Sequence, residues 1–129
     1  MGAAAAYNPA AGSTILFGGS TAAGPVADTW AWDGQNWWQL HPPQSVPDAR
    51  SGAPLSYSAA DHGLVLYGGS TGASAALNDT WIWNGASWIQ GKPTAGPQVG
   101  NAIIGMVYDS AWKAVVLVGG GETWTWTGQ

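Results

Sequence analysis

Hydrophobic and polar residues recur along the chain in one order that is repeated three times. Each copy has a short aliphatic run that ends in two glycines, then a polar loop, then two tryptophans separated by one residue. In the central copy the run is 64–67, the glycines are Gly68 and Gly69, and the tryptophans are Trp81 and Trp83. Short apolar runs bounded by glycine and turn residues are typical of β-strands. The pattern therefore predicts three β-sheets of similar construction.

The spacing of the copies indicates the architecture. Tyr7, Tyr57 and Tyr108 stand 50 and 51 residues apart, and a period near 50 residues is typical of propeller blades. The first strand of each copy is predicted to end at this tyrosine, at 2–7, 52–57 and 102–108. The second strand is predicted to run into the glycine pair, at about 14–18, 64–68 and 114–118. Those glycines are expected where the backbone approaches a neighbour closely or needs dihedral angles that a Cβ would forbid.

The tryptophan pairs predict a third strand in each copy, because side chains at i and i+2 share one face of a sheet. The pairs are Trp30/Trp32, Trp81/Trp83 and Trp124/Trp126. Asp33-Gly34 and Asn84-Gly85 then predict turns, since these residues tolerate positive φ. A fourth strand follows at 37–40 and 88–90, and the third copy stops before its own. We therefore expect eleven strands in three blades, at about 1–41, 51–91 and 101–129.

The aliphatic run with its glycine pair, the variable loop, the aromatic pair and the further tryptophan resemble the kelch repeat. The resemblance covers nearly the whole chain and implies a β-propeller of four-stranded blades around a channel, with the first strand of each blade innermost. It also implies a ligand-binding role for Arg50. This residue lies in the segment 47–52, which is similar to the segment that precedes the first strand of a kelch blade. An arginine there often faces the ligand-binding mouth, whereas the next copy has Asn101 at this position.

The number of blades predicts self-assembly. The chain is all-β and holds about 2.75 blades, whereas closed propellers need about four to eight. We expect two chains to close a ring of six blades as a homodimer, because the end blades would otherwise expose apolar faces. The last strand would then form an unpaired outer edge that could recruit another chain. Its residues are Thr123, Trp124, Thr125, Trp126 and Thr127.

Composition narrows the classes of partner. The 129 residues include 10 Trp and 20 Gly but only three cationic side chains, and the formal net charge is −4. A nucleic-acid partner is not expected, because phosphates would be repelled rather than neutralised. The chain has 0 Cys, which excludes disulfides and thiolate metal sites. No apolar run approaches membrane-spanning length, so no membrane partner is expected, and the sequence does not indicate a compartment.

Catalytic chemistry is not predicted, and neither a metal nor a cofactor is expected. His41 and His62 are the only imidazoles, and we interpret them as isolated and solvated. Asp28, Asp79 and Glu122 precede the tryptophan pairs. They could ring one mouth and bind a cation, but we favour carboxylates that accept backbone N–H bonds at loop ends.

The leading hypothesis is a non-catalytic binding or scaffold module that self-assembles into a closed propeller. Two alternatives stay open: a carbohydrate-binding, lectin-like propeller, and a fragment or engineered segment of a larger kelch propeller whose only activity is assembly. Hydroxyls after the glycine pairs lack a repeat-equivalent histidine to activate them, so they are considered for binding only. The ligand, a protein or a glycan, is expected at the loops and at two tryptophans without repeat equivalents. The candidate residues are Ser20, Thr21, Arg50, Ser70, Thr71, Trp38 and Trp112.

Overall fold

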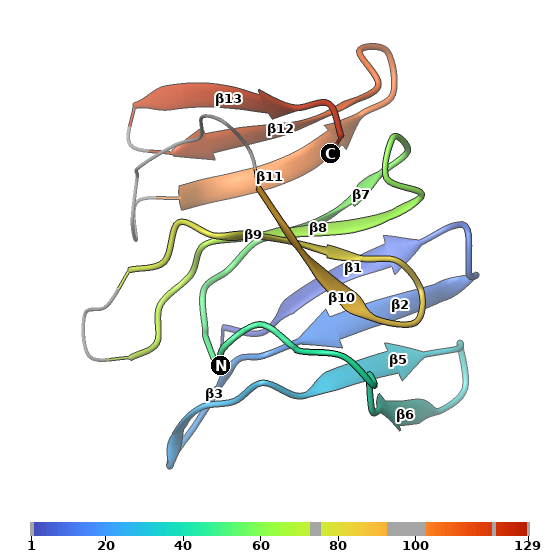
Figure 1. Cartoon of the computed structure of the whole chain (residues 1–129), viewed down its shortest axis with the longest axis vertical. Helices are drawn as coiled ribbons and strands as arrows, with labels where there is room; N and C mark the ends of the chain where they lie inside the picture. Colours follow the sequence, from blue (N-terminus) through green and yellow to red (C-terminus); the bar gives the residue numbers. More distant parts are fainter. Residues whose placement is uncertain (1, 73–75, 93–102, 120, 129) are drawn as a thin grey trace.

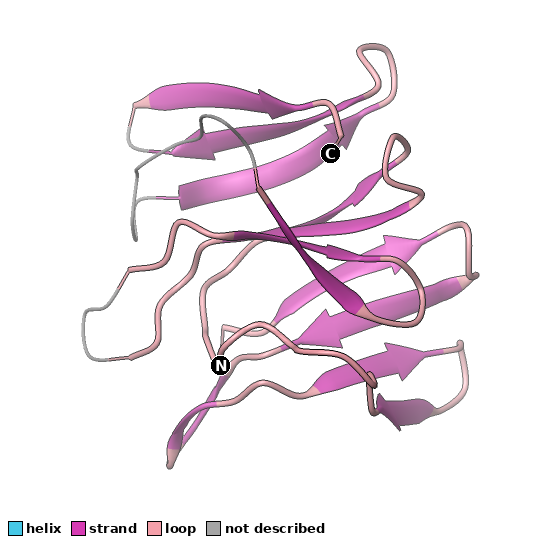
Figure 2. Ribbon diagram, viewed as in Figure 1, coloured by secondary structure: helices cyan, strands magenta, loops and turns pink. Residues whose placement is uncertain are grey.

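The chain forms three antiparallel sheets stacked along its longest axis (Figure 1). A computed structural model describes residues 2–72, 76–92, 103–119 and 121–128. These residues form strands, turns and loops without helix (Figure 2), which confirms the all-β prediction. Within them, no helix is long and apolar enough to cross a membrane.

The strand order in each sheet follows the chain. The first sheet is β1-β2-β5-β6, the second is β7-β8-β9-β10, and the third is β11-β12-β13. The bounds are β1 Ala4–Asn8, β2 Ser13–Phe17, β5 Thr29–Trp32, β6 Trp37–Leu40, β7 Leu55–Ser58, β8 Gly63–Tyr67, β9 Thr80–Trp83, β10 Trp88–Gly91, β11 Ile103–Asp109, β12 Ala114–Gly119 and β13 Glu122–Trp126. The first strands of the first two sheets begin two to three residues later than the repeat predicts.

Pairing between strands places the tryptophans that recur in the repeat on one side of each sheet, whereas Trp38, which has no repeat equivalent, lies on the other side. In the second sheet one row across the strands is Tyr57, Leu64, Trp83 and Trp88. The next row on the same side is Leu55, Leu66, Trp81 and Gln90. We call this side of each sheet its tryptophan face, and the other side its opposite face. The prediction that each tryptophan pair shares a face is confirmed.

The tryptophan face of the second sheet packs against the opposite face of the first. Both contribute to one core of buried side chains: Ala4, Ile15 and Phe17 from the first sheet, and Leu55, Leu64, Leu66, Trp81, Trp83 and Trp88 from the second. The Trp88 and Phe17 rings meet edge to face with centroids 5.1 Å apart. The Trp88 Nε1–H also donates to Thr29 Oγ1 at 3.0 Å. Trp88 therefore both fills this interface and fixes its register.

The third sheet packs against the second in the same sense. Trp126, on its tryptophan face, donates its indole N–H to Asp61 Oδ2 of the second sheet at 2.7 Å. Val115 and Leu117, in the same rows as the tryptophans, are buried. β1 contacts β7, and β7 contacts β11, so the first strands of neighbouring sheets are adjacent. Both interfaces join a tryptophan face to the opposite face of the preceding sheet.

The glycine pairs of the first two sheets meet both conditions that the sequence predicts, whereas Gly120 of the third pair lies outside the described residues. Gly18 and Gly19 have φ of +70° and +100°, and Gly68 and Gly69 have φ of +65° and +92°. A Cβ on Gly18 would lie 2.6 Å from the carbonyl oxygen of Arg50. Gly18 and Gly69 therefore allow the segment that leads into the second sheet, at residues 50–53, to pass close to their backbones.

The turns after the tryptophan pairs differ from the prediction in their mechanism. Only the glycines have positive φ, at +102° for Gly34 and +99° for Gly85. Asp33 and Asn84 stabilise the turns differently, because their Oδ1 atoms each accept two backbone N–H bonds at 2.8–2.9 Å. The side chain therefore substitutes for a backbone acceptor, as Asx turns do.

A short two-stranded ladder was not predicted. β3 (Ser20–Thr21) pairs with β4 (Gly24–Pro25) in the loop between β2 and β5. Thr21 closes its turn, because its Oγ1 donates to the Gly24 carbonyl and accepts from the Ala23 N–H. Two residues per strand are too short for a hydrophobic pattern to reveal.

Three repeat-equivalent turn positions have positive φ, at Gly12 (+68°), His62 (+51°) and Lys113 (+53°). Residues with a Cβ are strained there, so we expect His62→Gly and Lys113→Gly each to raise the free energy of unfolding by about 0.5–1 kcal/mol. Gly12→Ala should lower it. Urea denaturation at one protein concentration measures all three. A loss of stability in His62→Gly would show that the imidazole itself contributes.

Candidate functional site

Arg50 lies inside the junction between the first two sheets, and the prediction that the loops present it at a mouth is wrong. Its side chain is 0% exposed. The guanidinium donates to the Gly68 carbonyl and forms a bidentate pair with Asp79, at 2.6 and 2.9 Å. Its backbone N–H donates to Val26, and its carbonyl accepts from Gly19. Arg50 therefore ties the first sheet's loop to the second sheet, a role that the kelch resemblance did not reveal.

Asp79 is the counter-charge of Arg50. Burial raises the pKa of Asp79, but hydrogen bonds from Arg50 and from the Trp81 indole, together with the arginine charge, outweigh burial and hold it below its ordinary value. Burial and the Asp79 charge raise the pKa of the nearby Tyr67. Asp79 thus remains ionised, and its hydrogen bonds come chiefly from side chains, whereas the sequence favours backbone N–H donors.

The other two acidic residues before the tryptophan pairs lie elsewhere. Glu122 accepts the indole N–H of Trp124 at 2.8 Å, as Asp79 does for Trp81 at 2.7 Å. The Asp28 side chain is exposed, and its carbonyl accepts the Gly18 N–H. Among the described residues, no group of three potential metal ligands comes together. Two of the three acids, Asp79 and Glu122, therefore accept the indole N–H of the tryptophan two residues later.

The hydroxyls after the glycine pairs lie in local turns. Thr21 closes the β3–β4 turn, and Ser70 Oγ accepts the Gly72 N–H at 3.2 Å. The Ser51 and Ser70 backbones exchange hydrogen bonds at 2.9 and 3.0 Å. Ser20 and Thr71 are partly buried beside them. The two loops approach each other, since a Cβ on Gly72 would be 3.3 Å from Pro25.

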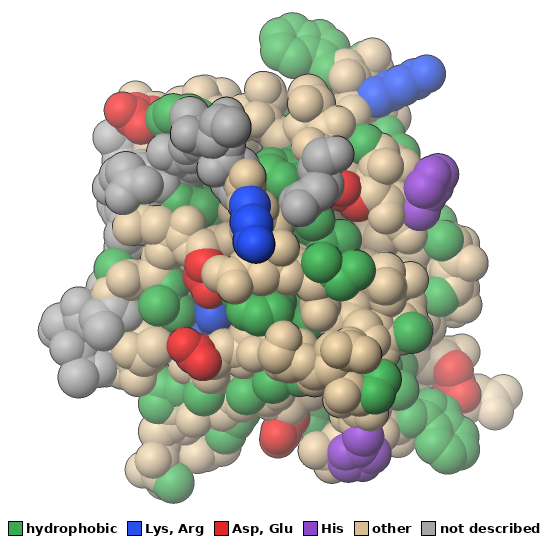
Figure 3. All heavy atoms as spheres, viewed as in Figure 1, with side chains coloured by type: hydrophobic (Ala, Val, Ile, Leu, Met, Phe, Trp, Pro, Cys, Tyr) green, Lys and Arg blue, Asp and Glu red, His purple; other side chains and the backbone are tan. Residues whose placement is uncertain are grey.

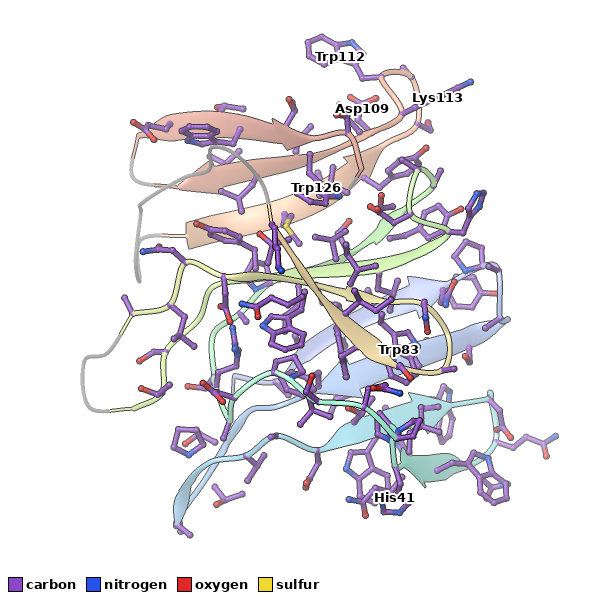
Figure 4. The ribbon with its side chains drawn as sticks, in the orientation of Figure 1. His41, Trp83, Asp109, Trp112, Lys113 and Trp126 are labelled. Carbon is purple, nitrogen blue, oxygen red and sulfur yellow. The ribbon has the colours of Figure 1, made fainter. Side chains whose placement is uncertain are left out.

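The two tryptophans without repeat equivalents are exposed. Trp38 is 57% exposed and Trp112 is 74% exposed. Trp38 donates its indole N–H to Asp33 Oδ2 at 3.1 Å, and bonds from Asn36, Gln35 and Trp38 hold the pKa of Asp33 below its usual value. Trp112 projects from the β11–β12 turn at one end of the molecule (Figure 4).

The end sheets leave two unlike faces uncovered within the chain. The tryptophan face of the first sheet carries Tyr7, 58% exposed, and Trp37, 47% exposed, beside the partly buried Trp30 and Trp32. The opposite face of the third sheet carries Val107, 63% exposed, and Val118, 41% exposed, beside Val116, Thr123 and Thr125. Charged side chains are sparse on the surface in Figure 3. Neither face has a charged residue in its central rows.

Comparison with known proteins identifies the architecture. No protein-family profile matches the chain, and no curated protein matches its sequence. Among solved structures, YjhT, a kelch-repeat propeller protein, is similar with a TM-score of 0.64 and 18% sequence identity. The similarity covers 96% of this chain but only 40% of YjhT. This chain has the fold of part of a kelch propeller. The kelch-like segment thus spans less than half the length of the structure that it matches.

The Arg50–Asp79 pair is expected to stabilise the kelch-like segment strongly. Arg50→Met leaves Asp79 partly buried without its counter-charge, so we expect the free energy of unfolding to fall by about 3 kcal/mol. Because the folded pKa of Asp79 is lowered, its contribution is complete above the unfolded pKa of about 3.9 and is lost as pH falls through the folded value. In Asp79→Asn, the free energy of unfolding, measured by urea denaturation at a series of acidic pH values, should therefore depend less on pH than in the wild type.

Lys92→Met is the matched control, since Lys92 is an exposed cation. Its urea midpoint should equal that of the wild type within experimental error. The double variant Arg50→Met/Asp79→Asn should be more stable than Arg50→Met alone, because no uncompensated carboxylate remains. Equal loss in the single and double variants would contradict a pairing role.

Proposed function

We propose that this chain is a non-catalytic assembly module, two copies of which close head to tail into a six-bladed kelch-like propeller. One observation carries the proposal. The two uncovered end faces are the repeat equivalents of the two kinds of face that are packed together inside the chain, at both sheet-to-sheet interfaces. Covering the end faces would repeat an arrangement that this sequence already forms.

The contacts expected between copies can be named from the internal interface. Trp37 is the equivalent of Trp88, which packs on Phe17 and donates to Thr29. The equivalents of Phe17 and Thr29 in the third sheet are Val118 and Thr123. Trp37 of one copy should therefore pack on Val118 of the other and donate its indole N–H to Thr123. These side chains are exposed within a single chain.

Trp112 also lies where a second copy would meet this one. Its equivalent in the second sheet is Asp61, which accepts the indole of Trp126 in the following sheet. The equivalent of Trp126 in the first sheet is Trp32. Trp112 should therefore lie near Trp32 of the second copy, and aromatic pairs of this kind contribute about 0.5–1.5 kcal/mol beyond their buried area.

Light scattering on a sizing column, at several concentrations, tests the assembly. We expect a mass twice that of the 13.2 kDa chain. Trp37→Ala should raise the dissociation constant about 30-fold, because a buried aromatic anchor is worth about 2 kcal/mol at an interface. Thr123→Val, which keeps the shape and removes the acceptor, should weaken association less.

Trp38→Ala is the control for association, since Trp38 is the neighbouring exposed tryptophan but lies on the opposite face of the first sheet. Circular dichroism shows whether each variant is folded. A folded wild-type monomer at all concentrations, or a dimer equally weakened by both tryptophan variants, would refute the proposed seam.

Trp38 favours carbohydrate binding as a second candidate function. Its ring is 57% exposed and is held by Asp33, so it offers a flat, preorganised surface on which a sugar ring could stack. Titration of an oligosaccharide panel against intrinsic fluorescence should then give a saturable change that Trp38→Ala abolishes and Trp112→Ala retains. A panel that produces no saturable change would exclude this candidate.

A further inference from the structure

The outer edge of β13 differs from the corresponding edges of the other two sheets. In the first sheet, β5 pairs with β2 on one side and β6 on the other, and in the second sheet β9 lies between β8 and β10. In the described part of the chain, β13 pairs with β12 alone. It lies at the upper end of the molecule in Figure 1. Its other edge therefore presents backbone N–H and C=O groups without a strand partner.

The two occupied edges show which sequence fits beside a tryptophan pair. Trp37 lies opposite Trp32, and Trp88 lies opposite Trp83, with ring centroids 5.3 Å apart in both pairs. Two residues later, a glutamine lies opposite the first tryptophan of the pair, as Gln39↔Trp30 and Gln90↔Trp81. The residue between them is apolar and exposed, Trp38 in one sheet and Ile89 in the other. Both edges thus take aromatic–apolar–Gln in one register.

We propose that β13 binds an extended segment of another polypeptide, of the pattern aromatic–apolar–Gln, as an antiparallel outer strand. The aromatic residue would lie opposite Trp126, the apolar residue opposite Thr125, and the glutamine opposite Trp124. Unpaired strand edges recruit strands through main-chain hydrogen bonds, and alternate side chains supply specificity. This inference goes beyond ring closure, because it concerns the edge of a sheet and not the faces that would join two copies.

The receiving surface is already fixed by other contacts. The Trp126 indole is held by Asp61 at 2.7 Å, and the Trp124 indole is held by Glu122 at 2.8 Å. Both rings are therefore oriented before a strand arrives, which lowers the entropic cost of binding. Thr123 and Thr125 are exposed and β-branched, a type that suits strand pairing. A lysine or a proline, which would block an edge strand, is absent from Glu122–Trp126.

A labelled peptide with the chain's own sequence Gly85–Gly91, GASWIQG, provides the test. Fluorescence anisotropy on the full 129-residue chain should show saturable binding, and the peptide with Ala in place of Trp88 should bind at least tenfold more weakly. Hydrogen exchange should slow at amides of Glu122–Trp126 and not at the edge strand β6. The mass of the chain is measured in parallel, so that loss of the ring and loss of peptide binding are distinguished.

Two further peptides, N-methylated at Ile89 or at Gln90, separate strand pairing from hydrophobic adsorption. Adjacent N–H groups of a strand point to opposite sides, so only one methylation should abolish binding. Equal binding of all four peptides would overturn the proposal, as would absence of binding up to about 1 mM, a very weak affinity. Growth of the chain beyond two copies without peptide binding would show that β13 edges pair with one another, and would also overturn it.

Discussion

The structure depends on one contact, the packing of the tryptophan face of a sheet on the opposite face of the sheet before it. A four-stranded sheet has two faces, and here both are apolar, so neither a single sheet nor a pair can bury its own surface. Trp88 illustrates how the contact is specified: its ring fills space beside Phe17, and its N–H finds Thr29. The large indole supplies area, and its single donor supplies register.

A second constraint acts where the chain crosses from one sheet to the next. Arg50 brings a charge into that crossing, and its cost is offset by a bidentate carboxylate and a carbonyl acceptor. The glycine pairs make the crossing possible, since a Cβ on Gly18 would collide with the Arg50 carbonyl. Two kinds of contact therefore join the sheets. The apolar packing is non-directional, whereas the hydrogen bonds of Arg50 depend on direction.

The repeat predicted the sheets well because period, glycine pairs and alternating tryptophans are local signals. It failed at Arg50, because whether an arginine faces solvent or Asp79, 29 residues later, depends on how two sheets meet. It also assigned Asp33 and Asn84 to positive φ, because a turn pattern does not show whether the backbone or the side chain satisfies the turn. Trp37 and Trp88 have equivalent sequence positions, yet one is 47% exposed and the other 1%. Position in the stack decides that difference, and no single repeat encodes it.

The two ends of the stack are unlike, and this gives the module a direction. An interface between unlike faces is heterologous, so it can continue indefinitely unless the rotation from sheet to sheet returns to its start. In the assembly that we propose, the same surfaces would form either a closed ring or an open helical fibre, and the rotation between successive sheets, not the affinity, would decide which. The crossing between the first two sheets, where Arg50 pairs with Asp79, lies away from the end faces. In the assembly that we propose, residues remote from the seam would therefore contribute to the choice between ring and fibre.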